Sequence, residues 1–123
     1  EGVGQLLGNI GMIREHLNNS LHISAIVLTM YDARTKLASE VADEVRGQFG
    51  QVVLNNVIPR SVKVSEAPGY GQTVIDYDPG SRGALAYFDA ARELAHRGDY
   101  QPHPSTGPIG VSPEVYAQLD EEE

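Results

Sequence analysis

Two apolar, β-branched runs separated by a stretch of helical period constrain the fold of this chain most strongly. The runs are HISAIVLTM at residues 22–30 and VVLNNVI at 52–58, and residues 35–49 between them repeat apolar side chains at every fourth position. Strands that alternate with helices pair in parallel and form an α/β sheet. Such a sheet usually has about five strands or more, so we expect most of it to lie outside this chain.

Two further helices and a long loop complete the expected order of elements. Apolar spacing predicts an amphipathic helix over 3–17, and Ser81 predicts the N-cap of a last helix. Gly50 predicts the end of the middle helix. Pro and Gly punctuate residues 61–80, which predicts an irregular segment. The last helix is expected to bury a stripe of four side chains, Ala84, Phe88, Ala91 and Ala95.

Charge is distributed unevenly along the 123 residues. The net charge is −8, yet residues 1–98 carry all nine Lys and Arg with eleven acidic residues, whereas residues 99–123 carry six acidic residues and no base. We therefore expect one domain over 1–98, belonging to a larger fold, and a disordered, Pro-rich acidic tail over 99–123. The sequence has no cysteine, which excludes disulfides, and it has no apolar run long enough to span a bilayer.

A complete active site is not expected in this chain. A phosphate-binding P-loop needs Gly-Lys followed by Ser or Thr, whereas Lys36 follows Thr and Lys63 follows Val. The four histidines lack the spacing of metal ligands. Ser65 and Glu66 lie side by side but have no His to complete a nucleophile. We therefore predict no catalytic residue, no metal site and no activity for this chain alone.

Basic residues follow both apolar runs. Arg34 lies four positions beyond Met30, and Arg60 and Lys63 follow Ile58. In an open parallel sheet, the loops after the carboxyl ends of the strands form the ligand face. Arg and Lys contacts to phosphate dominate nucleic-acid binding that does not depend on base sequence. The alternative is that these are solvated surface charges, and spacing alone favours that alternative.

Three segments resemble the carboxyl-terminal half of the ParA/Soj chromosome-partitioning ATPases. They are EGVGQLL at the start, LTMYDARTKL at 28–37 and VIPRSVKVSEAPGYGQTVIDYDPGSRGALAY at 57–87, and the likeness covers residues 1–97. The resemblance implies a deviant-Walker P-loop ATPase fold that uses ATP and Mg²⁺ and forms a homodimer with ATP. It also implies non-specific DNA binding, a ParB partner and a cytoplasmic, nucleoid-associated protein. The Walker segments are expected upstream of Glu1, as part of a longer protein.

The same resemblance implies roles for four residues. Arg34 falls on the Arg of the family's DART segment, and Lys63 falls on the basic position after its IPR segment. Both are DNA-contacting positions in the family. Pro59 and Ser61 fall on the two positions that border adenine. The family commonly has Asn where this chain has Ser61, which leaves a side-chain contact to adenine open at that position.

Two alternatives remain open. A MinD-like division-site regulator of the same superfamily usually ends in a basic amphipathic membrane helix, whereas this chain ends YAQLDEEE, which anionic lipid would repel. A protein-interaction module without catalysis would lack an upstream Gly-Lys-Thr. We therefore expect no membrane binding, and we expect the residues before Glu1 to decide between an ATPase and a module.

Overall fold

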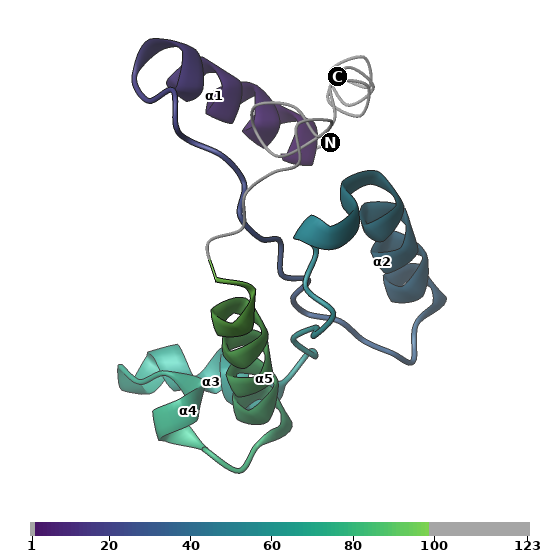
Figure 1. Ribbon diagram of the computed structural model, residues 1–123. Helices are drawn as coiled ribbons and strands as arrows, with labels where there is room; N and C mark the ends of the chain where they lie inside the picture. The colour runs from purple at the N-terminus through teal and green to yellow at the C-terminus, as the bar shows by residue number, and fades with distance from the viewer. Residues whose placement is uncertain (1, 99–123) are drawn as a thin grey trace. The chain divides into compact units, whose positions relative to one another are not determined.

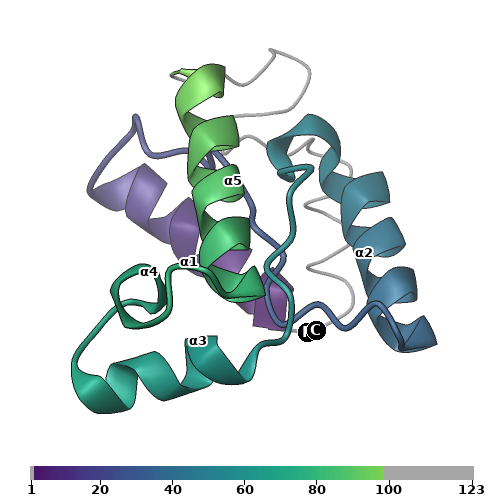
Figure 2. The same ribbon diagram turned by 90° about the horizontal axis from the view of Figure 1, so that it is seen from below.

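The structure is a computed structural model that describes residues 2–98 (Figures 1 and 2). The chain divides into two compact units, and residues 25–98 form one of them, whereas residues 2–24 belong to the other. The acidic tail predicted over 99–123 lies outside the described residues, and the domain boundary after residue 98 stays a prediction.

The helix α1 (Gly2–His16) confirms a helix over most of residues 3–17, but Val3, Leu6 and Ile13 of its predicted apolar face are exposed. Leu7 is its largest buried side chain. After the helix ends, Arg14 Nη1 donates a hydrogen bond to the carbonyl oxygen of Leu21 at 2.7 Å. This bond ties the chain that leaves α1 back to the last turn of the helix.

Helical segments dominate the described part of the second unit. They are α2 (Lys36–Phe49), η1 (Gly50–Val52), α3 (Val62–Glu66), η2 (Ala67–Tyr70), α4 (Val74–Tyr77) and α5 (Arg82–Arg97). The expectation of an irregular segment over 61–80 was therefore wrong. Pro68 lies in the first turn of η2, where a missing N–H costs no hydrogen bond, and Gly71 closes that turn with a left-handed φ of 67°.

The ends of the two long helices follow local sequence signals. Thr35 Oγ1 accepts a hydrogen bond from the Ala38 N–H at 3.2 Å and begins α2. Ser81 Oγ accepts the Ala84 N–H at 3.2 Å and begins α5, which confirms Ser81 as the predicted N-cap. Gly50 ends α2 with a φ of 60°, as predicted. These side chains satisfy N–H groups that the first turn of a helix leaves unpaired.

The two apolar runs pair in parallel, but neither forms a strand within residues 2–98. Two isolated parallel bridges join them, Ile26 with Val53 and Tyr31 with Pro59. Between the bridges, the N–H groups of Asn55 and Asn56 donate to the Glu93 carboxylate at 2.7 and 2.9 Å. The strands predicted over 22–30 and 52–58 were wrong as regular strands, because these N–H groups bond to a side chain instead of to a neighbouring backbone.

Side chains of α5 and α2 hold the second extended segment, which runs between these helices in both views (Figures 1 and 2). From α5, Arg97 donates to the carbonyl oxygens of Gln51 at 2.6 Å and Val53 at 3.2 Å. From α2, Arg46 Nη1 donates to the carbonyl oxygen of Leu54 at 3.1 Å. Charged groups thus supply partners that an adjacent strand supplies in a larger sheet.

Glu93 is the central anion of this attachment. Burial raises the pKa of its carboxyl, but the N–H groups of Asn55 and Asn56 and the charge of Arg97 outweigh burial, so the net pKa is lowered. Arg97 Nη2 donates to Glu93 Oε2 at 3.2 Å. The carboxylate is therefore ionised and fixes α5 against the bend in the extended segment.

Two small apolar clusters form the core of the second unit, and both use α5. Leu54 and Ile58 pack with Ala90, and Ala67 and Val74 pack with Ala84. The predicted stripe on α5 was wrong beyond Ala84, because Phe88 is 50% exposed and Ala91 and Ala95 are also exposed. The bonds from Glu93 and Arg97 turn a different face of α5 toward the extended segment.

Candidate functional site

The parallel pairing brings the two predicted DNA-contacting loops to the same edge of the second unit. Tyr31 donates its N–H to the carbonyl oxygen of Ile58 at 3.0 Å, and Arg60 donates its N–H to the carbonyl oxygen of Tyr31 at 3.0 Å. Pro59 lies opposite Tyr31 in the bridge. The turn that carries Arg34 and the short helix α3, which carries Lys63, therefore start from adjacent points.

Arg34 lies in a tight turn that begins α2, and Asp32 holds its side chain. Arg34 Nε donates to Asp32 Oδ1 at 2.9 Å, and Arg34 Nη2 donates to Asp32 Oδ2 at 3.0 Å. The side chain of Arg34 is 87% exposed, whereas that of Asp32 is 16% exposed. The guanidinium thus extends from a carboxylate that is itself largely covered.

Electrostatics keep this pair ionised. The hydrogen bonds from the Arg34 side chain and N–H, with a smaller effect of the Arg34 and Arg60 charges, outweigh burial and lower the pKa of Asp32 to about 2. The bond to Asp32 in turn raises the pKa of Arg34. Asp32 is paired with Arg34, and the weaker effect of the Arg60 charge leaves two cations and one anion around this turn.

Lys63 lies on α3 among two carboxylates and an aromatic ring. Its Nζ is 3.9 Å from Glu66 Oε2 and 3.9 Å from Asp78 Oδ2, and its side chain is 49% exposed. The ammonium also lies 5.8 Å from the centroid of the Tyr77 ring. A cation over an aromatic face is attracted by the ring quadrupole. Lys63 is thus held by groups whose total charge is negative.

The Tyr77 ring is itself fixed in place. Its hydroxyl donates to Glu66 Oε2 at 2.7 Å, and Tyr70 stacks on it with ring centroids 5.1 Å apart. The hydrogen bond to Glu66, helped by burial and by the negative charge, raises the pKa of Tyr77 to about 12. The sequence signal for this cluster is the spacing of Lys63 and Glu66, three apart on a helix, but nothing local in the sequence indicates the tyrosines.

The two predicted adenine-bordering residues lie between these turns. Pro59 is half-buried and forms the bridge to Tyr31. Ser61 precedes α3 without a side-chain cap bond, and its Oγ lies 3.2 Å from the position that a Cβ on Gly83 would take. The side chain of Ser61 thus packs toward the first turn of α5.

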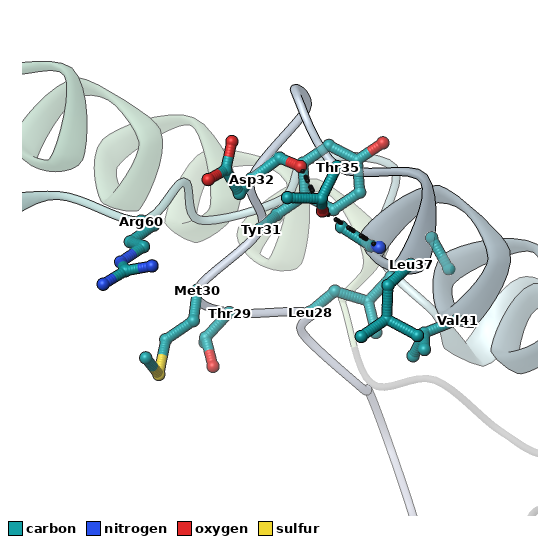
Figure 3. Close-up of a pocket in the computed structure, with 11 residues that line it drawn as sticks. Leu28, Thr29, Met30, Tyr31, Asp32, Thr35, Leu37, Val41 and Arg60 are labelled. Carbon is teal, nitrogen blue, oxygen red and sulfur yellow. Dashed lines mark hydrogen bonds between the residues drawn. The ribbon is translucent and has the colours of Figure 1, made fainter.

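A pocket of roughly 340 Å³ lies beside the Arg34 turn (Figure 3). Figure 3 shows Met30 and Arg60 at one end of the pocket and Leu37 and Val41 at the other. Met30 has a left-handed φ of 53°, which side chains other than glycine rarely adopt. Arg60 lines this pocket but was not among the predicted site residues. Its position directly after Pro59, which was predicted to border adenine, was the signal in the sequence that could have indicated it.

None of the helices in residues 2–98 combines the length and the apolar character that crossing a membrane requires. In the same range, no group of three or more His, Asp or Glu side chains is arranged to hold a metal ion.

Comparison of the amino-acid sequence with known proteins identifies the family of this chain. The family model described as the CobQ/CobB/MinD/ParA nucleotide binding domain matches residues 2–74. The chain belongs to this family of nucleotide-binding proteins, whose fold is that of the P-loop NTPases.

Within this family, the chain is similar to chromosome-partitioning proteins. It is 48% identical over 98 residues to the sporulation initiation inhibitor protein Soj of Bacillus subtilis, covering 80% of this chain and 39% of that protein. It is 47% identical over 97 residues to the chromosome partitioning protein ParA of Caulobacter vibrioides, covering 79% of this chain and 36% of that protein. It is 45% identical over 97 residues to the chromosome-partitioning ATPase Soj of Treponema pallidum, covering 79% of this chain and 38% of that protein. The chain thus spans less than two fifths of the length of these relatives.

Proposed function

We propose that this chain is the carboxyl-terminal part of a ParA-type chromosome-partitioning ATPase and supplies its non-specific DNA-binding face. The whole protein would use ATP and Mg²⁺, form a homodimer with ATP, work with a ParB-type partner and associate with the nucleoid in the cytoplasm. The names of the relatives support this assignment, because those from Caulobacter vibrioides and Treponema pallidum are named as chromosome-partitioning proteins and are matched over most of this chain.

The observation that carries the DNA-binding part is the shared edge of the Arg34 turn and the helix α3. The bridge between Tyr31 and Pro59 joins the segments that lead to Arg34 and Lys63. The side chains of both cations are solvent-accessible, 87% and 49% exposed. Phosphates lie close together along a duplex, so two cations at one edge can contact the same backbone without reading bases.

Part of an adenine pocket is proposed at the same junction. Pro59 offers an apolar ring without an N–H, which suits a contact with the face of a base. Ser61 would form the wall of that pocket through its backbone, because its side chain packs toward Gly83. The phosphates and Mg²⁺ would be held by residues outside this chain.

The test measures DNA binding by the full-length protein, meaning this chain with the nucleotide-binding residues that the proposal places before it. Fluorescent duplexes of unrelated sequence are titrated with ATP and Mg²⁺ present. We expect Arg34→Ala combined with Lys63→Ala to weaken binding to every duplex by about tenfold or more, because two phosphate contacts per subunit are lost.

The matched control combines Arg82→Ala with Arg92→Ala, which also removes two positive charges, both from exposed positions of α5. We expect it to retain the affinity of the parent. Equal affinity of the parent and the double variant would contradict the proposal. Binding to anionic vesicles without binding to DNA would instead indicate a MinD-like protein.

A further inference from the structure

Asp32 occupies only one edge of the Arg34 guanidinium. Its two oxygens accept from Nε and from one N–H of Nη2, at 2.9 and 3.0 Å. A guanidinium has a second edge, formed by Nη1 and the remaining N–H of Nη2, with the same fork geometry. Since the Arg34 side chain is 87% exposed, this second edge is open to solvent.

The turn around Asp32 is fixed at several points. Asp32 Oδ1 also accepts the N–H of Arg34 at 3.1 Å. The carbonyl oxygen of Asp32 accepts both the N–H of Thr35 at 3.0 Å and its hydroxyl at 2.9 Å. Thr35 then caps α2. The carboxylate that holds the guanidinium is therefore part of a rigid turn at the start of a helix.

We propose that Asp32 is a positioning residue that holds Arg34 by its inner edge and presents the outer edge to a DNA phosphate. This inference rests on the proposed DNA-binding function and names a residue that the sequence did not indicate. Guanidinium and phosphate pair through two parallel hydrogen bonds, so the orientation of the outer edge decides how well the contact forms. A flexible exposed Arg would lose more conformational entropy on binding than one already held by a carboxylate.

The opposite role for Asp32 is that of a competitor, whose carboxylate keeps phosphate away from Arg34. The two roles predict effects of opposite sign. Removing a competitor, or merely removing a negative charge near DNA, raises affinity for DNA. Removing a positioning residue lowers that affinity even though a negative charge has gone.

The experiment introduces Asp32→Asn into the full-length parent protein and, separately, into its Arg34→Ala variant. DNA binding of each is again measured with fluorescent duplexes of unrelated sequence in the presence of ATP and Mg²⁺. Asn keeps an oxygen that can accept the N–H of Arg34, so the turn is retained, but it cannot pair with both nitrogens of the guanidinium. The charge-matched control is Glu40→Gln, which neutralises an exposed carboxylate on the first turns of α2, 3.8 Å from Lys36 Nζ.

We expect Asp32→Asn to weaken DNA binding about threefold in the parent, an effect typical of one exposed charged pair. In the Arg34→Ala background the same change should leave affinity unchanged or raise it. Glu40→Gln should leave affinity unchanged or raise it slightly. The thermal unfolding midpoint is compared for all variants to show that they are folded.

Two results would overturn the inference. Higher affinity for Asp32→Asn in the parent would show that Asp32 competes with phosphate, and equal affinity would show that Asp32 does not position Arg34. An equal loss in both backgrounds would show that Asp32 acts through the fold and not through Arg34. If Arg34→Ala itself binds DNA as the parent does, the proposed function fails first, and the two failures are thereby distinguished.

Discussion

The Arg34 turn and the Lys63 helix follow equivalent ends of two parallel segments, yet they hold their cations differently. At the first, Arg34 pairs with the single carboxylate of Asp32, and the charge of Arg60 acts weakly on the same carboxylate. At the second, Lys63 lies between the carboxylates of Glu66 and Asp78. One turn has an excess of positive charge and the other an excess of negative charge. Placement on a ligand edge therefore does not by itself make two basic residues equal contacts.

The two regions also differ in what supports them. The Arg34 turn is built from bonds within residues 32–38, whereas the Lys63 cluster combines α3, η2 and α4 and packs on the start of α5. Substitutions in other elements should therefore leave the geometry of the Arg34 turn unchanged. The geometry of the Lys63 cluster should change when packing between its helices is disturbed.

The largest effect is expected from a substitution at Gly83, where α5 meets α3. A Cβ there would overlap Val64 Cγ2 and lie 3.2 and 3.3 Å from Ser61 Oγ and Cβ. The side chain of Val64 is stiff, so α3 must shift. We expect Gly83→Ala to lower the free energy of unfolding by about 1–3 kcal/mol. It should also weaken DNA binding as Lys63→Ala does.

The control for this substitution is Gly80→Ala, because a Cβ at Gly80 meets no atom within 4 Å. Thermal unfolding followed by circular dichroism measures both variants. We expect Gly80→Ala to change stability by less than about 0.5 kcal/mol. Equal stability of the two variants would show that the Lys63 cluster does not depend on close packing against α5.

A smaller effect is expected from the tyrosine that supports Lys63. The pKa of Tyr77 is raised to about 12, so its hydrogen bond to Glu66 stabilises the fold below the ordinary tyrosine pKa and is lost as the pH rises through about 12. When tyrosine ionisation is followed by ultraviolet absorbance as the pH is raised, one tyrosine should ionise at a higher pH than the others. This step should be absent in the Tyr77→Phe variant. DNA affinity of that variant should fall by less than about twofold, since Lys63 keeps both carboxylate partners. A Tyr77 that titrates with the ordinary tyrosines would contradict this structure of the cluster.

Local signals allowed much of the helical structure to be predicted from the sequence. Ser81 and Gly50 act at helix ends through bonds to neighbouring residues, so the sequence around them contains the information needed. The parallel direction of residues 22–30 and 52–58 was also predictable, because a helix lies between them. The absence of regular strands could not be predicted, because the N–H groups of Asn55 and Asn56 donate to Glu93, which lies 38 and 37 residues away in the sequence.

The exposed face of α5 shows a different limit. Phe88, Ala91 and Ala95 have the spacing of a buried stripe, but the helix turns Ala90 inward. Periodicity identifies apolar positions, and long-range bonds from Glu93 and Arg97 select which of them are covered. The pair of Asp32 with Arg34 escaped prediction for a similar reason, since a spacing of two in a turn matches no helical or strand period.

The salt dependence of DNA binding tests the central claim, that Arg34 and Lys63 contact phosphates from one edge. Affinity of the full-length protein for a single duplex is measured across a range of salt concentrations. Each lost phosphate contact lowers the magnitude of the negative slope of log affinity against log salt by about 0.9, so Arg34→Ala should lower that magnitude by about 2 in a dimer. Lys63→Ala should lower it by a smaller amount, because Glu66 and Asp78 already balance its charge. Slopes equal to that of the parent in both variants would contradict the account.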